Sequence, residues 1–248
     1  MKRIISLVLA VIMIASLAAV FSSCGEDNKL VMATNAQFPP YEYYEGQKIV
    51  GIDAEIAALI AEKLGMTLEI ADIEFDSIIS GVQTGKYTMG MAGMTVTEDR
   101  LKNVNFSESY ATGVQVVIVT EDSPIKSVDD LGAEGATYKI GVQIATTGSI
   151  YAKDDYGEDR VVNYNNGAEA VEALKTGRVD CVIIDNEPAK AFVKANTGLA
   201  ILETEYVVEN YAIALNKNDT ELLEKINKAL KELKDAGKID EIINKYIK

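Results

Sequence analysis

The sequence predicts an α/β protein built from two similar lobes. Strand-like and helix-like stretches alternate along the chain from Leu30 onward, a pattern typical of α/β proteins with mostly parallel sheets. In addition, residues 79–93 and 170–185 share one pattern, in which a helix, a tight turn at Gly85 or Gly177 and an apolar strand follow one another. Two related lobes would explain this weak internal repeat.

The repeat also predicts where a ligand would lie. Aligning Gly85 with Gly177 places Gly93 opposite Asp185, because both pairs differ by 92 positions (177 − 85 and 185 − 93). Ligands of open α/β sheets bind beyond the carboxyl ends of the strands. We therefore expect Gly93 and Asp185 at the edge of a cleft, with chance similarity of two helix–turn–strand units as the alternative.

The chain begins with a predicted export signal over residues 1–23. A short basic start precedes an apolar run over residues 4–21, and two serines then lead into Cys24. The pattern resembles a bacterial lipoprotein signal, in which the cysteine carries the lipid and becomes the first mature residue. It implies an extracytoplasmic protein that is lipid-anchored to the cell membrane, with residues 24–29 as the tether. An uncleaved transmembrane anchor is the alternative, since the run is about long enough to span a bilayer.

Composition excludes several function classes. The 248 residues include no histidine, which rules out Ser-His-Asp catalysis and histidine-ligated zinc. Lys and Arg number 24 against 38 Asp and Glu, so the net charge of −14 argues against nucleic acid as a partner. We expect no metal site and no cofactor. A binding protein, a carboxylate-based enzyme and a structural module remain possible.

The first predicted elements are a strand, a helix and a second strand. Residues 30–34 form a buried strand, and residues 68–70 form the next one. Between them, residues 53–64 carry apolar side chains at helical spacing, and Gly65 is a helix stop.

Later segments continue the alternation. Strands are predicted over residues 114–119 and 138–142, and two helices over 220–236 and 239–247 end the sequence. Cys181 lies in an apolar run, so we expect a small buried hydrophobe and no intrachain disulfide.

Two segments offer groups that bind an anion. Thr97 can cap a short helix that places Arg100 near a strand end, where its guanidinium can hold a carboxylate with two hydrogen bonds. A surface arginine paired with Glu98 or Asp99 is the alternative. Thr146 and Thr147 follow a strand and begin a helix, whose free N–H groups suit an anion, although an ordinary cap explains them equally well.

Other groups suit a cation and an apolar side chain. Asp185 follows four apolar residues at a strand end, where its carboxylate can bind an ammonium group or form an Asx-turn. Phe38 and Phe75 each follow a strand and can wall a pocket, with core packing as the alternative. The combined set matches the carboxylate and ammonium groups of a free amino acid.

Four motifs occur in an order that is typical of one family. They are Gly51-Ile52-Asp53, the run from Ala92 to Arg100, the run from Asn105 to Tyr110, and Gly141-Val142-Gln143. On these motifs, the chain resembles the polar amino-acid substrate-binding proteins of ABC transporters, family 3 of the solute-binding proteins. The resemblance covers about residues 29–248.

The resemblance implies a two-lobed periplasmic-binding-protein-like fold of type II, which closes on its ligand by hinge motion. Lobe 1 is expected to comprise residues 30–113 plus 210–248, and lobe 2 residues 114–209. Two hinge strands are expected near residues 112–116 and 207–211.

The resemblance also implies roles for single residues. Arg100 would hold the ligand's carboxylate, helped by Thr95 and Thr147, and Asp185 would bind its ammonium group. The predicted ligand-binding residues are Asn35, Phe38, Phe75, Ala92, Gly93, Thr95, Arg100, Gln143, Thr146, Thr147 and Asp185.

The implied function is capture of a free L-amino acid for an ABC permease by a monomeric protein that is not an enzyme. Asn35 stands where cation-selective members often carry aspartate, which favours an uncharged polar ligand such as glutamine or cystine over a basic amino acid. The rival function is that of a cyclohexadienyl dehydratase-like enzyme, in which Glu42 or Glu187 would have to donate a proton. A ligand-sensing domain of a signalling chain is a third possibility.

Overall fold

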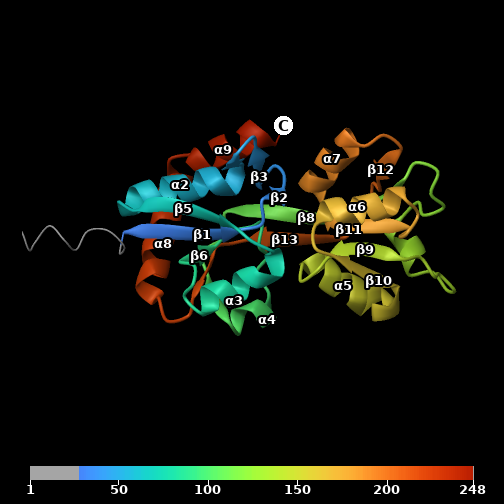
Figure 1. The fold of residues 1–248 in the computed structure, drawn as a ribbon, viewed down its shortest axis with the longest axis horizontal. Coiled ribbons are helices and arrows are strands. Elements are labelled where there is room, and N and C mark those ends of the chain that lie inside the picture. Colours follow the sequence, from blue (N-terminus) through green and yellow to red (C-terminus); the bar gives the residue numbers. More distant parts are fainter. Residues whose placement is uncertain (1–27, 248) are drawn as a thin grey trace, which may run out of the picture.

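Two mixed sheets organise residues 28–247, which are the residues that this computed structural model describes (Figure 1). The predicted export signal over 1–23 and the predicted lipid site Cys24 lie outside this range. We refer to the first sheet and its helices as lobe 1 and to the second sheet and its helices as lobe 2. Within residues 28–247, no helix combines the length and apolar character needed to cross a membrane.

The sheet of lobe 1 has five strands in the order β5-β1-β6-β14-β7. They are β5 (Thr67–Asp72), β1 (Lys29–Thr34), β6 (Met89–Gly90), β14 (Ala214–Asn216) and β7 (Val104–Phe106). Strand β1 pairs in parallel with β5 and β6, whereas β14 runs antiparallel to β6 and β7.

Helices cover both faces of this sheet (Figure 1). Leu30 and Met32 of β1 pack among the residues of α2 and the C-terminal helices, while Ala33 packs on the opposite side against α3. The helices are α2 (Ile52–Leu64), α3 (Ile78–Gln83), α4 (Glu98–Leu101), α8 (Thr220–Asp235) and α9 (Lys238–Tyr246). The helices predicted over 53–64, 220–236 and 239–247 are thus confirmed to within two residues.

The sheet of lobe 2 has the order β10-β9-β11-β8-β12, and β13 pairs with β8. Its strands are β8 (Ala111–Thr120), β9 (Ile140–Gln143), β10 (Val161–Tyr164), β11 (Cys181–Asp185), β12 (Leu199–Ile201) and β13 (Val207–Tyr211). Its helices are α5 (Thr147–Tyr156), α6 (Gly167–Lys175) and α7 (Asn186–Ala195).

Strand β11 is covered on both faces, which explains its continuous apolar sequence. Val182 and Ile184 pack with residues of α6 and α7, whereas Cys181 and Ile183 lie in the core beside α5. Cys181 is fully buried, so its predicted character as a small buried hydrophobe is confirmed, and burial raises the pKa of its thiol to about 12.

The two lobes share one topology, which supports the internal repeat. The orders β5-β1-β6-β14 and β10-β9-β11-β8 both join three parallel strands to an antiparallel one. Gly85 and Gly177 occupy equivalent turns, with φ values of 76° and 71°.

Two sequence predictions were wrong in detail. The sheets are mixed rather than mostly parallel, because strands from elsewhere in the chain enter antiparallel. Strand β6 ends at Gly90, before the bend in which Gly93 adopts a φ of 51°.

Strands β8 and β13 run between the lobes (Figure 1). They pair antiparallel with each other, from Ala111 opposite Tyr211 to Gln115 opposite Val207. These are the segments that the sequence predicted as hinge strands, and the lobe boundaries placed beside them stay a prediction.

A small sheet of β2 (Gln37–Phe38), β3 (Glu42–Glu45) and β4 (Lys48–Val50) was not predicted. It leads into α2 through Gly51, whose φ is 125°, and a Cβ there would lie 2.2 Å from the Tyr41 carbonyl oxygen. Glycine therefore permits the close turn that fixes Phe38 and Glu42 relative to α2.

Candidate functional site

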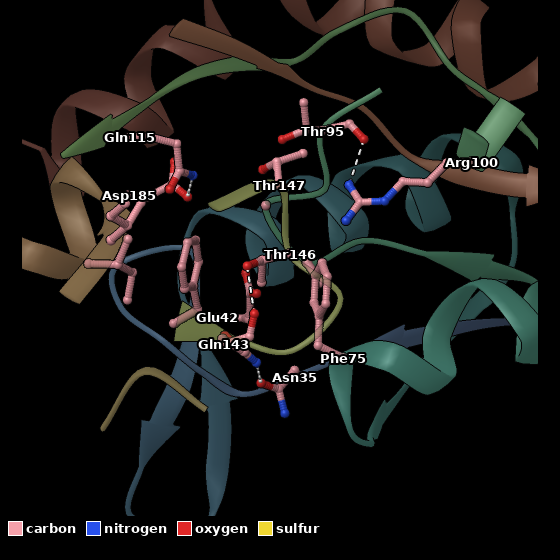
Figure 2. Close-up of a pocket in the computed structure, with 15 residues that line it drawn as sticks. Asn35, Glu42, Phe75, Thr95, Arg100, Gln115, Gln143, Thr146, Thr147 and Asp185 are labelled. Atoms are coloured by element: carbon pink, nitrogen blue, oxygen red, sulfur yellow. Dashed lines mark hydrogen bonds between the residues drawn. The ribbon is translucent and has the colours of Figure 1, made fainter. Parts of the chain in front are cut away.

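A cavity lies between the two lobes, where the strands of both sheets end (Figure 2). About 460 Å³ inside it, including solvent at its mouth, is free of protein atoms. All eleven residues predicted from the sequence line this cavity. Four lining residues were not among the predicted ligand contacts, namely Glu42, Gln115, Ile183 and Ile184.

Both lobes supply the lining. Lobe 1 contributes the segments after β1 and β6, together with Phe75 and Arg100. Lobe 2 contributes Gln143 at the end of β9, the start of α5, and Asp185 at the end of β11. Since these segments follow carboxyl ends of parallel strands, the structure places Gly93 and Asp185 where the repeat predicted them.

Arg100 is buried at one end of the cavity. Its guanidinium donates hydrogen bonds to the carbonyl oxygens of Thr95 (2.7 Å) and Ala145 (3.0 Å), and it lies 5.4 Å from the centre of the Phe75 ring. Burial lowers the pKa of Arg100 to about 10, an effect that Glu209 opposes, so the guanidinium stays positive at neutral pH. The alternative of a surface arginine is wrong, because Asp99 pairs with Lys102 instead.

The helix starts on both sides of Arg100 follow the sequence prediction. The Thr97 hydroxyl accepts a hydrogen bond from the Arg100 amide, and the Thr146 hydroxyl accepts one from the Ser149 amide (each 3.2 Å). Thr146 therefore caps α5, and Thr147 in its first turn is buried against the cavity. Figure 2 shows Thr95, Thr147 and Arg100 at one end of the site. A guanidinium beside a helix N-terminus forms an anion-binding region.

Asp185 is buried near the other side of the cavity, beside Gln115 (Figure 2). One carboxylate oxygen accepts a hydrogen bond from the Tyr211 hydroxyl, and the other accepts one from the Gln115 amide at 2.7 Å. Its side chain does not cap α7, so the Asx-turn alternative is wrong. Burial raises the pKa of Asp185 to about 8, with a further contribution from the charge of Glu209. A cation beside this carboxylate would offset both the cost of burying its charge and the repulsion from Glu209.

The two predicted aromatic walls are present. Phe38 on the small sheet and Phe75 both line the cavity. Phe75 also packs against Ile78 and Val82. This ring therefore belongs to the core and lines the cavity at the same time.

Amide groups of both lobes meet beyond these rings. The Gln143 amide donates to the Asn35 side-chain oxygen at 3.0 Å, and the Asn35 amide donates to the Ile73 carbonyl at 2.9 Å. With the Arg100–Ala145 hydrogen bond, the first of these joins the lobes directly across the cavity.

Glu42 adds a carboxyl group that was considered only as a proton donor for the enzymatic rival. Its side chain is buried, and its Oε2 atom has no hydrogen-bond partner among residues 28–247. Burial, and then the neighbouring Asp53, hold the pKa of Glu42 well above its usual range. Asp53 accepts hydrogen bonds from the Gly93 amide (2.9 Å) and the Tyr110 hydroxyl (2.8 Å), and burial raises its pKa to about 6. Glu42 and Asp53 therefore form a buried acidic pair beside the cavity.

The other proposed proton donor lies elsewhere. Glu187 is not among the lining residues and forms an ion pair with Lys190 at 2.6 Å. Gln115 could have been found from the sequence, because it is a lone polar residue inside a predicted apolar strand. Ile183 and Ile184 directly precede Asp185.

The site has the groups for holding a zwitterion. It offers a cation and a helix start for one charge, a carboxylate for the opposite charge, and aromatic walls between them. In the part of the chain described, no cluster of three or more acidic or cysteine side chains is arranged to hold a metal ion.

Comparison with known proteins identifies relatives along nearly the whole chain. The model of the bacterial extracellular solute-binding proteins, family 3, matches residues 30–248. The arginine-binding extracellular protein of Bacillus subtilis (strain 168) is 35% identical, over 99% of this chain and 97% of the relative.

Solved structures extend the comparison to the fold. Two structures of an ancestral arginine-binding protein, one bound to glutamine and one to arginine, are 40% identical with TM-scores of 0.82. Each covers 90% of this chain, and this chain covers 99% and 100% of them. An ancestral amino-acid-binding protein described as a precursor of cyclohexadienyl dehydratase is 31% identical, with a TM-score of 0.81 over 89% of this chain and 96% of that chain. The predicted two-lobed fold of type II periplasmic binding proteins is confirmed.

The acidic pair predicts how stability depends on pH. A carboxyl group with a higher pKa in the folded protein than in the unfolded chain stabilises the fold while protonated, and this contribution is lost as pH rises through the folded pKa. Raising the pH from about 4 to about 8 should therefore lower the free energy of unfolding of the ligand-free protein. Glu42→Gln should reduce this loss by about 1.4 kcal/mol for each unit of pKa elevation that it removes.

Urea unfolding of ligand-free protein at several pH values measures the effect. Glu45→Gln is the matched control, because Glu45 is exposed on the same small sheet. Equal pH dependence in the Glu42→Gln and Glu45→Gln proteins would contradict the assignment of a buried acidic pair.

Proposed function

Because the chain belongs to family 3 of the bacterial extracellular solute-binding proteins, we propose that it captures a free L-amino acid outside the cell membrane for an ABC importer. The observation that carries this proposal is the placement of Arg100 and Asp185 in one cavity, each on a different lobe. An α-amino acid carries one group of each charge on neighbouring atoms. Its carboxylate would bind Arg100 and the start of α5, and its ammonium group would bind Asp185.

The same arrangement supports a hinge. The ligand would contact both lobes at once, while β8 and β13 run between them and pair with each other. Closing around the ligand would shield Arg100 and Asp185 from water and strengthen their interactions with it. We therefore propose that β8 and β13 bend when the lobes open and close.

For the ligand's side chain, we propose a basic amino acid, with L-arginine first. Once the ligand's carboxylate and ammonium groups are matched by Arg100 and Asp185, the Glu42 carboxyl remains, and one of its oxygens has no hydrogen-bond partner in the part of the chain described. A guanidinium beside Glu42 would lower the pKa of that carboxyl, because the positive charge stabilises the ionised carboxylate. This reverses the preference for glutamine or cystine, which was drawn mainly from Asn35. Relatives named as arginine-binding support the revision, and the ancestral protein bound to either arginine or glutamine makes glutamine the main competitor.

We propose that the protein is not an enzyme. Of the two suggested proton donors, Glu42 lines the cavity and Glu187 does not. Glu42 belongs to the acidic pair with Asp53. A dehydratase would turn over prephenate or arogenate, whereas a receptor binds its ligand unchanged. The similarity to a dehydratase precursor makes that assay worth performing, although the precursor itself is described as amino-acid-binding.

The partners and the location complete the proposal. We propose that cleavage before Cys24 leaves a lipid-anchored monomer that delivers its ligand to permease subunits in the same membrane. The support is the lipoprotein-like pattern of residues 1–24 and the family's extracellular character.

Replacing Arg100 tests the amino-acid proposal. The Arg100→Ala protein should bind every amino acid at least ~100-fold more weakly than wild type, because two charge-assisted hydrogen bonds are lost in a buried site. Calorimetry of protein freed of carried-over ligand, against the twenty amino acids and cystine, measures this. Arg178→Ala, which removes an exposed arginine, should bind like wild type. Unchanged affinity after Arg100→Ala, or no binding by wild type, would refute the proposal.

Replacing Glu42 tests the basic ligand. Wild type should bind L-arginine more tightly than L-glutamine, and Glu42→Gln should weaken arginine binding by about 10- to 100-fold, as expected for a hydrogen bond to a charged group. Glutamine affinity should change much less, and Glu45→Gln should change neither. An equal loss for both ligands would show that Glu42 supports the site without selecting a cation.

A further inference from the structure

Three strands meet behind the ammonium end of the cavity. Asp185 at the end of β11 pairs with Gln115 of β8, and Glu209 of β13 pairs with Gly113 of β8. The Gln115 side-chain amide donates to both carboxylates, at 2.7 Å to Asp185 and 3.0 Å to Glu209. A Cβ at Gly113 would lie 2.6 Å from Asp185 Oδ1, so a glycine is needed where the strands and these side chains approach.

Glu209 is a buried carboxylate whose hydrogen-bond partner is Gln115. It is 3% exposed, and among the described residues its Oε2 atom accepts the Gln115 hydrogen bond while its Oε1 atom accepts none. It does not line the cavity, yet it acts on both charged ligand contacts there. Its charge favours the positive form of Arg100 and disfavours the negative form of Asp185.

We propose that Glu209 is a positioning residue for the ammonium site: it holds Gln115 beside Asp185, and its own negative charge influences the charge that Asp185 presents to the ligand. The inference rests on the proposed function, because it assumes that an amino-acid ammonium group binds Asp185. Glu209 and Gln115 lie on the two strands between the lobes, so the same contacts link the ligand site to the proposed hinge.

The surroundings of Asp185 determine the direction of the effect. Burial is the main cause that raises the pKa of Asp185, and the negative charge of Glu209 raises it further. The hydrogen bonds that Tyr211 and Gln115 donate to Asp185 oppose this rise. Further groups near the pair are Tyr41 and Glu42 beside Asp185, and Arg100 and Tyr151 beside Glu209.

The pKa of Asp185, about 8 in the ligand-free protein, makes ligand affinity depend on pH. Below that pH, Asp185 must release a proton before it can bind an ammonium group, so affinity falls as pH falls. Removing the charge of Glu209 lowers the pKa of Asp185. Ligand affinity should then begin to fall at a lower pH than in wild type.

The experiment compares ligand affinity across pH in wild type and Glu209→Gln, which keeps the shape of the side chain. Calorimetry with L-arginine and L-glutamine from about pH 5.5 to about pH 8.5 gives the ratio of Kd at the two ends. We expect this ratio to be about 3- to 10-fold smaller in Glu209→Gln, since one unit of pKa corresponds to a tenfold change. Titration of the ligand is the same for both proteins and cancels.

Glu205→Gln is the control, because it removes the same charge from an exposed position four residues away. It should reproduce the wild-type pH profile. A loss of affinity in Glu209→Gln that is uniform across pH, or a pH profile that matches Glu205→Gln, would overturn the inference. Urea unfolding of both variants identifies a folding defect.

In case Glu209→Gln does not fold, Gln115→Glu provides the second test. The added negative charge should shift the fall of ligand affinity to higher pH, and an unshifted profile would overturn the inference. Absence of wild-type binding at every pH would instead refute the proposed function.

Discussion

The burial of opposite charges on two different lobes is the constraint on which this structure depends. Arg100 of lobe 1 and Asp185 of lobe 2 both lie in the cavity, away from most solvent, and burial disfavours the charged form of each. A buried charge needs a partner to offset its lost hydration. Neither residue forms an ion pair with the other, since carbonyl, hydroxyl and amide groups hold them in place. A zwitterion would supply both missing partners at once.

The fold explains how two such charges come together. Each lobe places a helix–turn–strand unit of the same kind at its cleft edge. The strands of these units end at Gly90, shortly before Gly93, and at Asp185. Strand ends bring polar groups to the cleft, while helices on the outer faces bury the apolar side chains of β1 and β11. The lobes meet through hydrogen bonds from Arg100 to Ala145 and from Gln143 to Asn35, so the described conformation is closed.

Much of the site was predictable because its residues follow strands in a simple order. Arg100, Thr147 and Asp185 occur at strand ends or helix starts, where the sequence alone indicates exposed polar groups beside an apolar core. Glu42 and Glu209 were not predicted as parts of the site. Glu42 reaches the cavity through a small sheet whose position depends on tertiary packing, and Glu209 lies in mid-strand and acts through Gln115. Periodicity predicted the helices over 53–64, 220–236 and 239–247 accurately, but it could not show that antiparallel strands complete each sheet.

Asn35 illustrates the limit of judging ligand preference from one position. Its amide donates to Ile73 and its oxygen accepts from Gln143, whereas one oxygen of Glu42 has no hydrogen-bond partner within the described range. The electrostatics of the cavity therefore depend on the whole set of buried carboxyl groups. The most direct test is a crystal structure of the ligand-freed protein soaked with L-arginine. We expect the ligand's carboxylate on Arg100 and Thr147, its ammonium group on Asp185 and its guanidinium beside Glu42. A ligand bound in the reverse direction, or outside this cavity, would contradict it.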